Sequence, residues 1–286
     1  LSLITFYRLN ASDLEMNFSA RESYNFLKKN SGHVHATTHV TNIIRSGLSG
    51  FNQAEKEKLR EFGISSEHGK VIVSAPEDLD QIYDSEHFRF HYTYESNDAI
   101  SNMDYILQMA SIFENVYSFY IDTLEFSPPV NDPDSDHSLY EIYVENLPSY
   151  FFGITYTKNT SIASPACASF IKMRNNYLGA QFSNHTELEN LQVTAVHEFF
   201  HAIQFSYNCY ERFWFMEATA VWSEDELYNN VNDHYRYIPS WFSNTNKPIN
   251  DESSHMSGSF IFFQYIDEHL GGPSTIKSCW EKSFEM

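Results

Sequence analysis

The sequence predicts an α+β protein: a twisted sheet followed by a mainly helical C-terminal part, and preceded by a small, mostly helical N-terminal region. The first observation is the run HFRFHYTY at residues 87–94, whose aromatic side chains fall on one face of a strand. The second is apolar residues at helical spacing in residues 98–120 and 191–207. The third is that residues 1–75 are polar, with helical patterns and few of the aromatic residues.

The remaining elements are expected in chain order. The helix at 98–120 should stop before Ser127-Pro128-Pro129, and a capping box of Thr186 and Glu189 precedes the helix at 191–207. Further strands are predicted at residues 139–144 and 168–173, and further helices at residues 20–29, 54–62, 214–229 and 259–269. We interpret residues 1–75 as an accessory or pro-like region and residues 76–286 as the main domain.

Composition excludes several kinds of partner. The 286 residues carry 38 acidic and 18 basic side chains, and this charge disfavours binding to nucleic acid or to an anionic membrane surface. The longest apolar run, residues 260–263, is far too short for membrane insertion. The three cysteines are compatible with one disulfide and a free thiol or with three thiols. Asn-x-Ser/Thr sequons favour a secreted or extracellular protein; they begin at Asn10, Asn17, Asn159 and Asn184.

The motif that points to a catalytic or metal site is His197-Glu198-Phe199-Phe200-His201, inside the predicted helix 191–207. Residues four apart leave the same face of an α-helix, so both imidazoles can bind one Zn²⁺. The neighbouring carboxylate of Glu198 can take a proton from a metal-activated water. The metzincin pattern is excluded, because Gln204 and Tyr207 stand where that pattern has Gly and a third His.

A catalytic zinc needs a third protein ligand. If the helix at 214–229 returns antiparallel to the first, a rise of about 1.5 Å per residue places Glu217 level with His201. Glu224 lies on the same face and would reach the level of His197, where it can accept a hydrogen bond from that imidazole. Asp225 is the alternative for this outer role. We therefore expect Glu217 to be the third metal ligand.

Less specific interpretations stay open from the residues alone. The HExxH run can be a hydrogen-bonded core network without metal, and Glu217 can be a solvated carboxylate at a helix start. Glu224 can belong to an ordinary acidic surface. His33, His35 and His39 have no carboxylate partner in their polar zone and are expected to face solvent.

The runs VTAVHEFFHAIQFSY (193–207) and WFMEATAVWSEDELYNNVND (214–233) resemble a mostly bacterial family of secreted zinc metallopeptidases of the Glu-zincin type, first labelled from a myxobacterial reading frame. The resemblance extends over about residues 76–284 and includes YDSEHFRFHY (83–92) and SGSFIFFQYIDEHLGG (257–272). Enhancin-like, mucin-directed metallopeptidases are a weaker match.

The resemblance implies a zincin-like fold, zinc ligands at His197, His201 and Glu217, and Glu198 as the catalytic base. One position departs from thermolysin-like enzymes, which have an outer Asp four residues after the ligand Glu. Val221 stands there, so the surroundings of the ligands must be built differently.

The expected function is that of a zinc-dependent metalloendopeptidase acting on protein or peptide substrates. Strand 168–173 is our candidate for the sheet edge that pairs an extended substrate. Residues 1–75 contain no cysteine, so inhibition by this segment would be steric or use other side chains. Spacing leaves several candidates for stabilising the oxyanion: Tyr228, His234, Tyr235 and His255.

Two alternatives from other classes accompany this expectation. One is a non-catalytic zinc-binding or adhesion protein that retains the zincin fold. The other is a zinc hydrolase whose substrate is not a peptide. Replacement of Glu198 separates the first alternative from an enzyme, because it should spare metal binding and abolish hydrolysis.

Overall fold

The computed structural model describes residues 19–28, 36–148, 150–158 and 164–284. Its main sheet has five strands in the order β3-β4-β5-β7-β6. The outer pairs β3–β4 and β6–β7 are antiparallel, whereas β4–β5 and β5–β7 are parallel. The strands of this sheet are β3 (Gln81–Asp84), β4 (Phe88–Tyr92), β5 (Tyr140–Glu145), β6 (Gly153–Thr157) and β7 (Ser169–Arg174).

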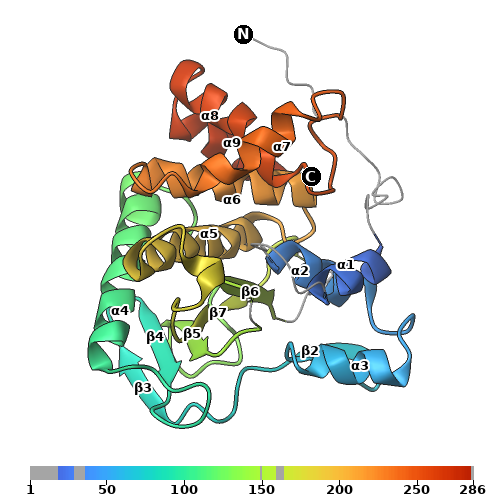
Figure 1. Cartoon of the computed structure of the whole chain (residues 1–286), viewed down its shortest axis with the longest axis vertical. Helices are drawn as coiled ribbons and strands as arrows, with labels where there is room; N and C mark the ends of the chain where they lie inside the picture. Colours follow the sequence, from blue (N-terminus) through green and yellow to red (C-terminus); the bar gives the residue numbers. More distant parts are fainter. Residues whose placement is uncertain (1–18, 29–35, 149, 159–163, 285–286) are drawn as a thin grey trace.

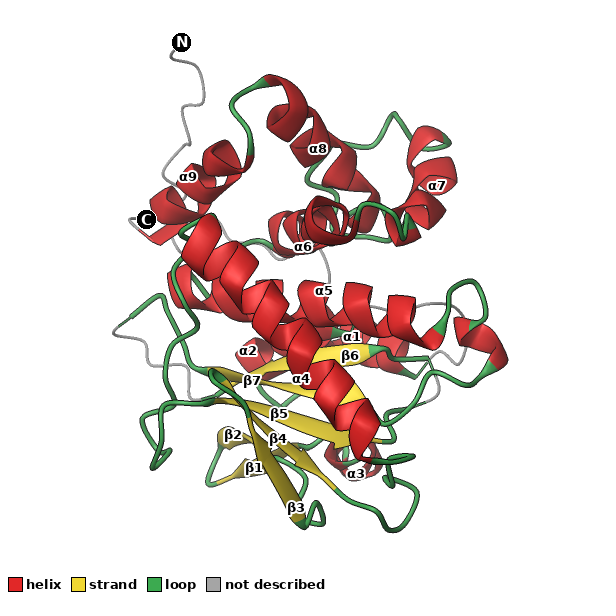
Figure 2. Ribbon diagram, turned by 90° about the vertical axis from the view of Figure 1, so that its left-hand side faces the viewer, coloured by secondary structure: helices red, strands yellow, loops and turns green. Residues whose placement is uncertain are grey.

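Helices form layers on one face of this sheet. Helices α4 and α5 pack against the strands, and α6 to α9 lie beyond α5 (Figure 2). The helices of this part are α4 (Met103–Tyr117, continued by a π-helix at Ser118–Thr123), α5 (Glu187–Tyr207), α6 (Phe213–Tyr228), α7 (Ile238–Phe242), α8 (Phe260–His269) and α9 (Pro273–Phe284). Short 3₁₀ turns lie at Ala180–Phe182, Asp233–Tyr237 and Ser257–Ser259.

The N-terminal region lies beside strand β6 and below it (Figure 1). Its elements are α1 (Ala20–Leu27), α2 (Thr37–Ser46), α3 (Gln53–Arg60) and the antiparallel pair β1 (Ile64–Glu67) and β2 (Lys70–Val73). Both α1 and α3 begin with a capping box, at Ser19 with Glu22 and at Asn52 with Glu55. Helix α2 has no side-chain cap at its start.

Alternate residues of the central strands face two apolar cores. Ile142 and Val144 of β5 face a core completed by α4, α5, α6, α8 and α9. Tyr143 between them faces a second core, which the side chains of α1, α2, α3 and β1 complete. The N-terminal region therefore covers the opposite face of the sheet. The division of the chain at residue 76 stays a prediction.

The mixed α+β architecture is confirmed, and most predicted elements occur within a few residues of their expected bounds. Helix α5 begins at the expected N-cap Thr186, whose side chain and that of Glu189 form the predicted capping box. Seven of the described helices and strands are not predicted: α2, α7, α9, β1, β2, β3 and β6. The placement of 168–173 at the sheet edge is wrong: β7 lies between β5 and β6, because the unpredicted strand β6 adds to its outer side.

One disulfide joins Cys167, just before β7, to Cys209 in the turn after α5, and Cys279 is a free thiol. This decides between the two cysteine states that composition allowed. None of the described helices is long and apolar enough to span a bilayer. Of the four sequons, Asn184 lies in an exposed turn, and Asn10, Asn17 and Asn159 lie outside the described residues.

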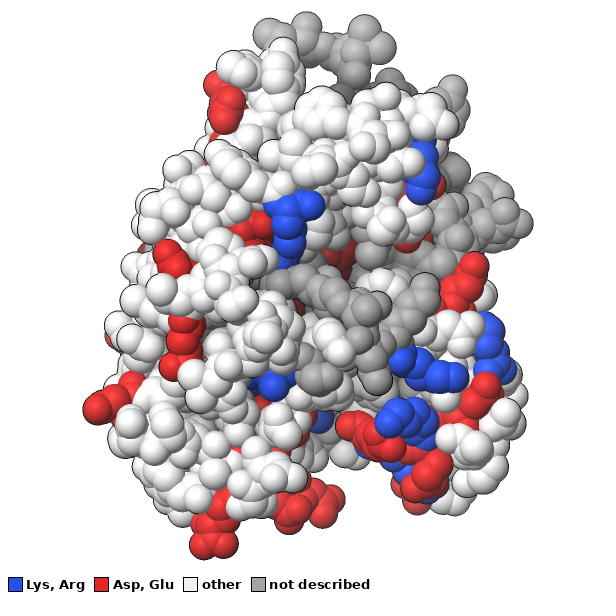
Figure 3. All heavy atoms as spheres, in the orientation of Figure 1, with Lys and Arg blue, Asp and Glu red and all other residues white. Residues whose placement is uncertain are grey.

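Acidic side chains are scattered over the face of the molecule in Figure 3, without a single dominant patch. The basic side chains of α3 lie among acidic ones, in ion pairs such as Lys58–Glu61 and Arg60–Glu57 (2.5 Å). Exposed pairs of this kind contribute little to stability. The acidic side chains visible on this face are thus distributed over it rather than gathered at one site.

Candidate metal centre

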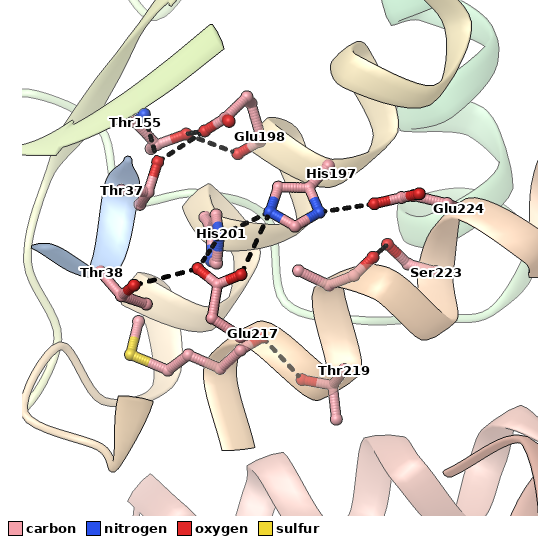
Figure 4. Close-up of polar contacts among 12 residues, drawn as sticks. Thr37, Thr38, Thr155, His197, Glu198, His201, Glu217, Thr219, Ser223 and Glu224 are labelled. Carbon is pink, nitrogen blue, oxygen red and sulfur yellow. Dashed lines mark hydrogen bonds and ion pairs between the residues drawn. The ribbon is translucent and has the colours of Figure 1, made fainter. Parts of the chain in front are cut away.

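Helix α5 carries both imidazoles of the motif into the interior. His197 and His201 are 1% and 0% exposed, and their Nε2 atoms lie 3.1 Å apart. The spacing of four residues puts both side chains on the same face of the helix, toward α6 (Figure 4). Two neutral imidazoles with converging Nε2 atoms offer two nitrogen ligands to one ion.

Glu217 of α6 completes the group. Its Oε1 lies 3.6 Å from Nε2 of His201, and its Oε2 lies 3.9 Å from Nε2 of His197. The three ligand atoms all fall within 4.8 Å of one another. Oε2 is buried and, among the described residues, has no hydrogen-bond donor. A buried carboxylate oxygen without a donor, facing two ring nitrogens, fits a cation, so this group can hold a metal ion.

The other ring nitrogen of each His is also engaged. Nδ1 of His197 lies 2.7 Å from Oε1 of Glu224, and Nδ1 of His201 lies 2.7 Å from Oε1 of Gln204. The Gln204 amide in turn donates to the Met216 carbonyl at 2.8 Å. These contacts fix both rings with Nε2 toward Glu217. Sequence reasoning proposed Glu224 here but missed Gln204, whose only signal is its place one turn after His201.

Burial dominates the electrostatics of the group. It lowers the pKa of His197 well below its usual value, and the neighbouring His201 lowers it further. Burial also opposes protonation of His201, but the hydrogen bond and the charge of Glu217 outweigh it and raise the pKa of that imidazole. The pKa of Glu224 is well above its usual value because of burial and the charge of Asp233. Metal binding therefore competes with a proton on His201.

Glu224→Gln should weaken metal binding by about 10–100-fold, because the neutral amide no longer supports the ring of His197 as a carboxylate does. Competition with a chromophoric chelator measures the change. Glu226→Gln on the same helix is the matched control, since that carboxylate interacts with Asp267 instead. Equal affinities of the two variants would show that the Glu224 carboxylate does not act on the site.

Glu198 lies beside the ligand group and is 1% exposed. Its Oε2 accepts hydrogen bonds from the hydroxyls of Thr37 in α2 and Thr155 in β6, each at 2.7 Å (Figure 4). Burial raises its pKa, which these two hydrogen bonds oppose. Strand β6 approaches this side chain closely at Gly153, where a Cβ would lie 2.8 Å from Cγ of Glu198. The carboxylate is thus held between the sheet and the ligand group.

The four candidates for stabilising an oxyanion are engaged in other contacts. The hydroxyl of Tyr228 accepts from Asn115 at 3.3 Å, His234 pairs with Asp225 at 3.5 Å, and His255 stacks on Trp241. Tyr235 is 58% exposed. Asp225, the alternative outer partner of His197, is therefore occupied by His234. The prediction that one of the four acts on a substrate gains no geometric support from these contacts.

Arg236 and Tyr237 form a further polar pair near the ligand group. Arg236 forms an ion pair with Asp233 at 2.5 Å and donates to the hydroxyl of Tyr237 at 2.9 Å. Burial raises the pKa of Tyr237 well above its usual value. The positive charge of Arg236 lowers this pKa, whereas the negative charges of Glu224, Asp233 and Glu217 raise it further. Arg236 and Tyr237 lie in a 3₁₀ turn that no sequence motif marks, so their place near the ligand group is not predictable from the sequence.

Residues 80–286 match a protein-family model. The chain belongs to DUF6055, a family of unknown function. The matched part begins just before β3 and includes the whole ligand group, whereas α1 to α3 and β1–β2 precede it. No curated protein matches the chain. The DUF6055 match thus assigns the chain to a family without assigning it an activity.

Proposed function

We propose that the protein is a secreted, zinc-dependent metalloendopeptidase of the Glu-zincin type. The observation that carries the proposal is the convergence of His197, His201 and Glu217 beside a separate carboxylate, Glu198. The sheet with an antiparallel edge strand next to the helix that bears the motif supports a zincin-like fold. The disulfide supports an oxidising compartment.

Zinc is the metal that this donor set suits best. Two imidazole nitrogens and one carboxylate oxygen from the protein, with a further position left for substrate or water, are typical of catalytic zinc sites. When bound, Zn²⁺ polarises a carbonyl group and makes water a nucleophile near neutral pH.

The chain's own residues supply the remaining functions. Glu198 would accept a proton from water and pass it to the leaving amine, and the hydroxyl of Thr155 orients its carboxylate. Strand β6 is the outer strand on this side, and the N–H of Thr155 bonds to a side chain, the hydroxyl of Thr37 at 2.8 Å. An extended peptide can pair with such an edge, so β6 replaces residues 168–173 as the proposed substrate strand.

Complete burial of the site favours a second candidate, a non-catalytic zinc-binding protein. The three ligands and Glu198 are each at most 1% exposed, and a peptide cannot reach them without a movement of the chain. Hydrolysis therefore separates the two candidates.

The test is metal removal from the purified full chain. We expect one zinc per chain and slow hydrolysis of an unfolded protein substrate over long incubation. A chelator should abolish this hydrolysis, and added Zn²⁺ should restore it. The non-catalytic candidate would be favoured if the full chain binds zinc without hydrolysis. The same must then hold for Thr37→Val and Arg45→Met, two variants that weaken the contacts of helix α2. Hydrolysis that resists the chelator would contradict zinc catalysis.

A further inference from the structure

The start of helix α2 lies directly on the ligand group and on Glu198. The hydroxyl of Thr37 donates to Oε2 of Glu198 at 2.7 Å and accepts from the N–H of Thr155 at 2.8 Å. The hydroxyl of Thr38 donates to Oε1 of Glu217 at 3.1 Å. Both threonines are 0% exposed, and Figure 4 shows them facing these carboxylates. Two consecutive residues of the N-terminal region thus contact the proposed base, a proposed ligand and the proposed substrate strand.

The two contacts of the Thr37 hydroxyl are ones that, under the proposed function, a substrate and a reacting water would make. The hydroxyl holds the carboxylate that would take a proton, and it uses the N–H of β6 that would pair with a peptide. All five residues of β6 are buried, so this edge is covered rather than open. Val40 and Ile43 of α2 share the second core with Ile154 and Tyr156 of β6. Helix α2 therefore packs on β6 where an extended substrate would bind.

The other end of α2 is clamped to the turn between α5 and α6. Arg45 donates to the carbonyl of Glu211 at 3.2 Å and to that of Cys209, and its guanidinium lies 4.5 Å from the centre of the Phe213 ring. Burial lowers the pKa of Arg45 to about 9, with Glu211 opposing this effect. A cation in this environment needs the two carbonyl groups as hydrogen-bond acceptors. Arg45 keeps both acceptors as long as α2 stays packed against the turn between α5 and α6.

We propose that α2 is an autoinhibitory element that closes the metal centre and must leave it before a peptide can be cleaved. The proposal rests on the proposed function, because it explains how a peptidase site can be completely buried. The contacts are hydroxyl hydrogen bonds, apolar packing on β6 and one half-buried cation, and no residue of α2 belongs to the ligand group. Displacement of α2 would expose Glu198, Glu217 and the edge of β6 together.

The test uses point variants of the full chain. Removal of residues 1–75 would uncover the second core of the sheet, so a loss of activity in that deletion would have a trivial cause. Thr37→Val removes the hydroxyl at nearly constant volume and leaves Thr155 N–H without its acceptor in the closed state. Arg45→Met removes the clamp and touches neither Glu198 nor the ligands. The matched control is Thr41→Val on the same helix, whose buried hydroxyl has no hydrogen-bond partner among the described residues.

Two rates are measured for each zinc-loaded variant: extraction of zinc by a chelator, and hydrolysis of a fluorogenic peptide library. The net free energy of a hydrogen bond to a charged group corresponds to a change of about tenfold or more in an equilibrium constant. We expect Thr37→Val and Arg45→Met each to raise both rates about 10–100-fold, and Thr41→Val to leave them near wild type. Circular dichroism and thermal unfolding confirm that each variant is folded.

The outcomes separate this proposal from the proposed function. Faster zinc extraction in both variants without hydrolysis in any protein supports the closure by α2 and overturns the peptidase assignment. Hydrolysis in the wild type at the rate of both variants, with unchanged zinc extraction, overturns autoinhibition and leaves the peptidase assignment intact. Equal increases in the Thr41→Val control would also overturn it, since the effect would then be general loosening of α2.

Discussion

Glu198→Gln, introduced into the Arg45→Met chain, is expected to lower kcat/KM for a peptide by about 10²–10⁴-fold, the range typical of general acid–base catalysis. The amide oxygen can still accept the hydroxyls of Thr37 and Thr155, so the packing of the site should survive. It cannot accept a proton from water near neutral pH. Zinc content and affinity should stay close to those of the parent chain, because Glu198 is not among the ligands.

The matched control for this prediction is Glu268→Gln, an exposed substitution of the same kind on α8. Steady-state kinetics with the same peptide compare the two variants, and metal analysis follows zinc in both. If Glu198→Gln and Glu268→Gln hydrolyse the peptide equally, Glu198 is not the base. If Glu198→Gln loses zinc as well as activity, its effect is structural.

Glu217→Ala should reduce zinc affinity by more than the roughly 10–100-fold expected for an outer partner such as Glu224. The substitution removes the only carboxylate of the ligand group and leaves two imidazoles, which is one protein ligand fewer than catalytic zinc sites use. It also removes the negative charge that raises the pKa of His201. Chelator competition at a fixed pH gives both affinities.

Glu224→Gln serves as the graded comparison for Glu217→Ala, since both positions lie on α6 and both side chains contact the imidazoles. The expected order of affinity is wild type, then Glu224→Gln, then Glu217→Ala. An unchanged affinity for Glu217→Ala would mean that another group supplies the third ligand.

Local regularities explain why much of the fold is predictable from the sequence. The alternation at residues 87–94 and the capping box at Thr186 locate β4 and α5, because each depends on neighbouring residues alone. Strand β6 escapes this reasoning because it is only five residues long, and the two apolar residues in its GITYT run, Ile154 and Tyr156, are too weak a strand signal. Helix α2 has several β-branched residues and no capping side chain, and packing rather than local preference decides its structure.

The same distinction applies to the candidate site. The helical spacing of His197 and His201 brings their rings together in any fold that keeps the helix, and a short antiparallel connection brings Glu217 to them. Thr37 contacts Glu198 across 161 residues of sequence, and no local pattern reports such a contact. His39 was expected to face solvent, and this is wrong: it is 7% exposed and stacks on Phe26. His33 and His35 lie outside the described residues.

X-ray absorption at the zinc edge of the zinc-loaded full chain tests the metal centre most directly. We expect one zinc ion with two imidazole nitrogens and carboxylate oxygen at about 2.0–2.2 Å, without sulfur. In Glu217→Ala the zinc signal should be lost, or the contribution of oxygen ligands to it should be smaller. Failure of the pure protein to retain zinc, or an unchanged spectrum in Glu217→Ala, would contradict a centre built from His197, His201 and Glu217.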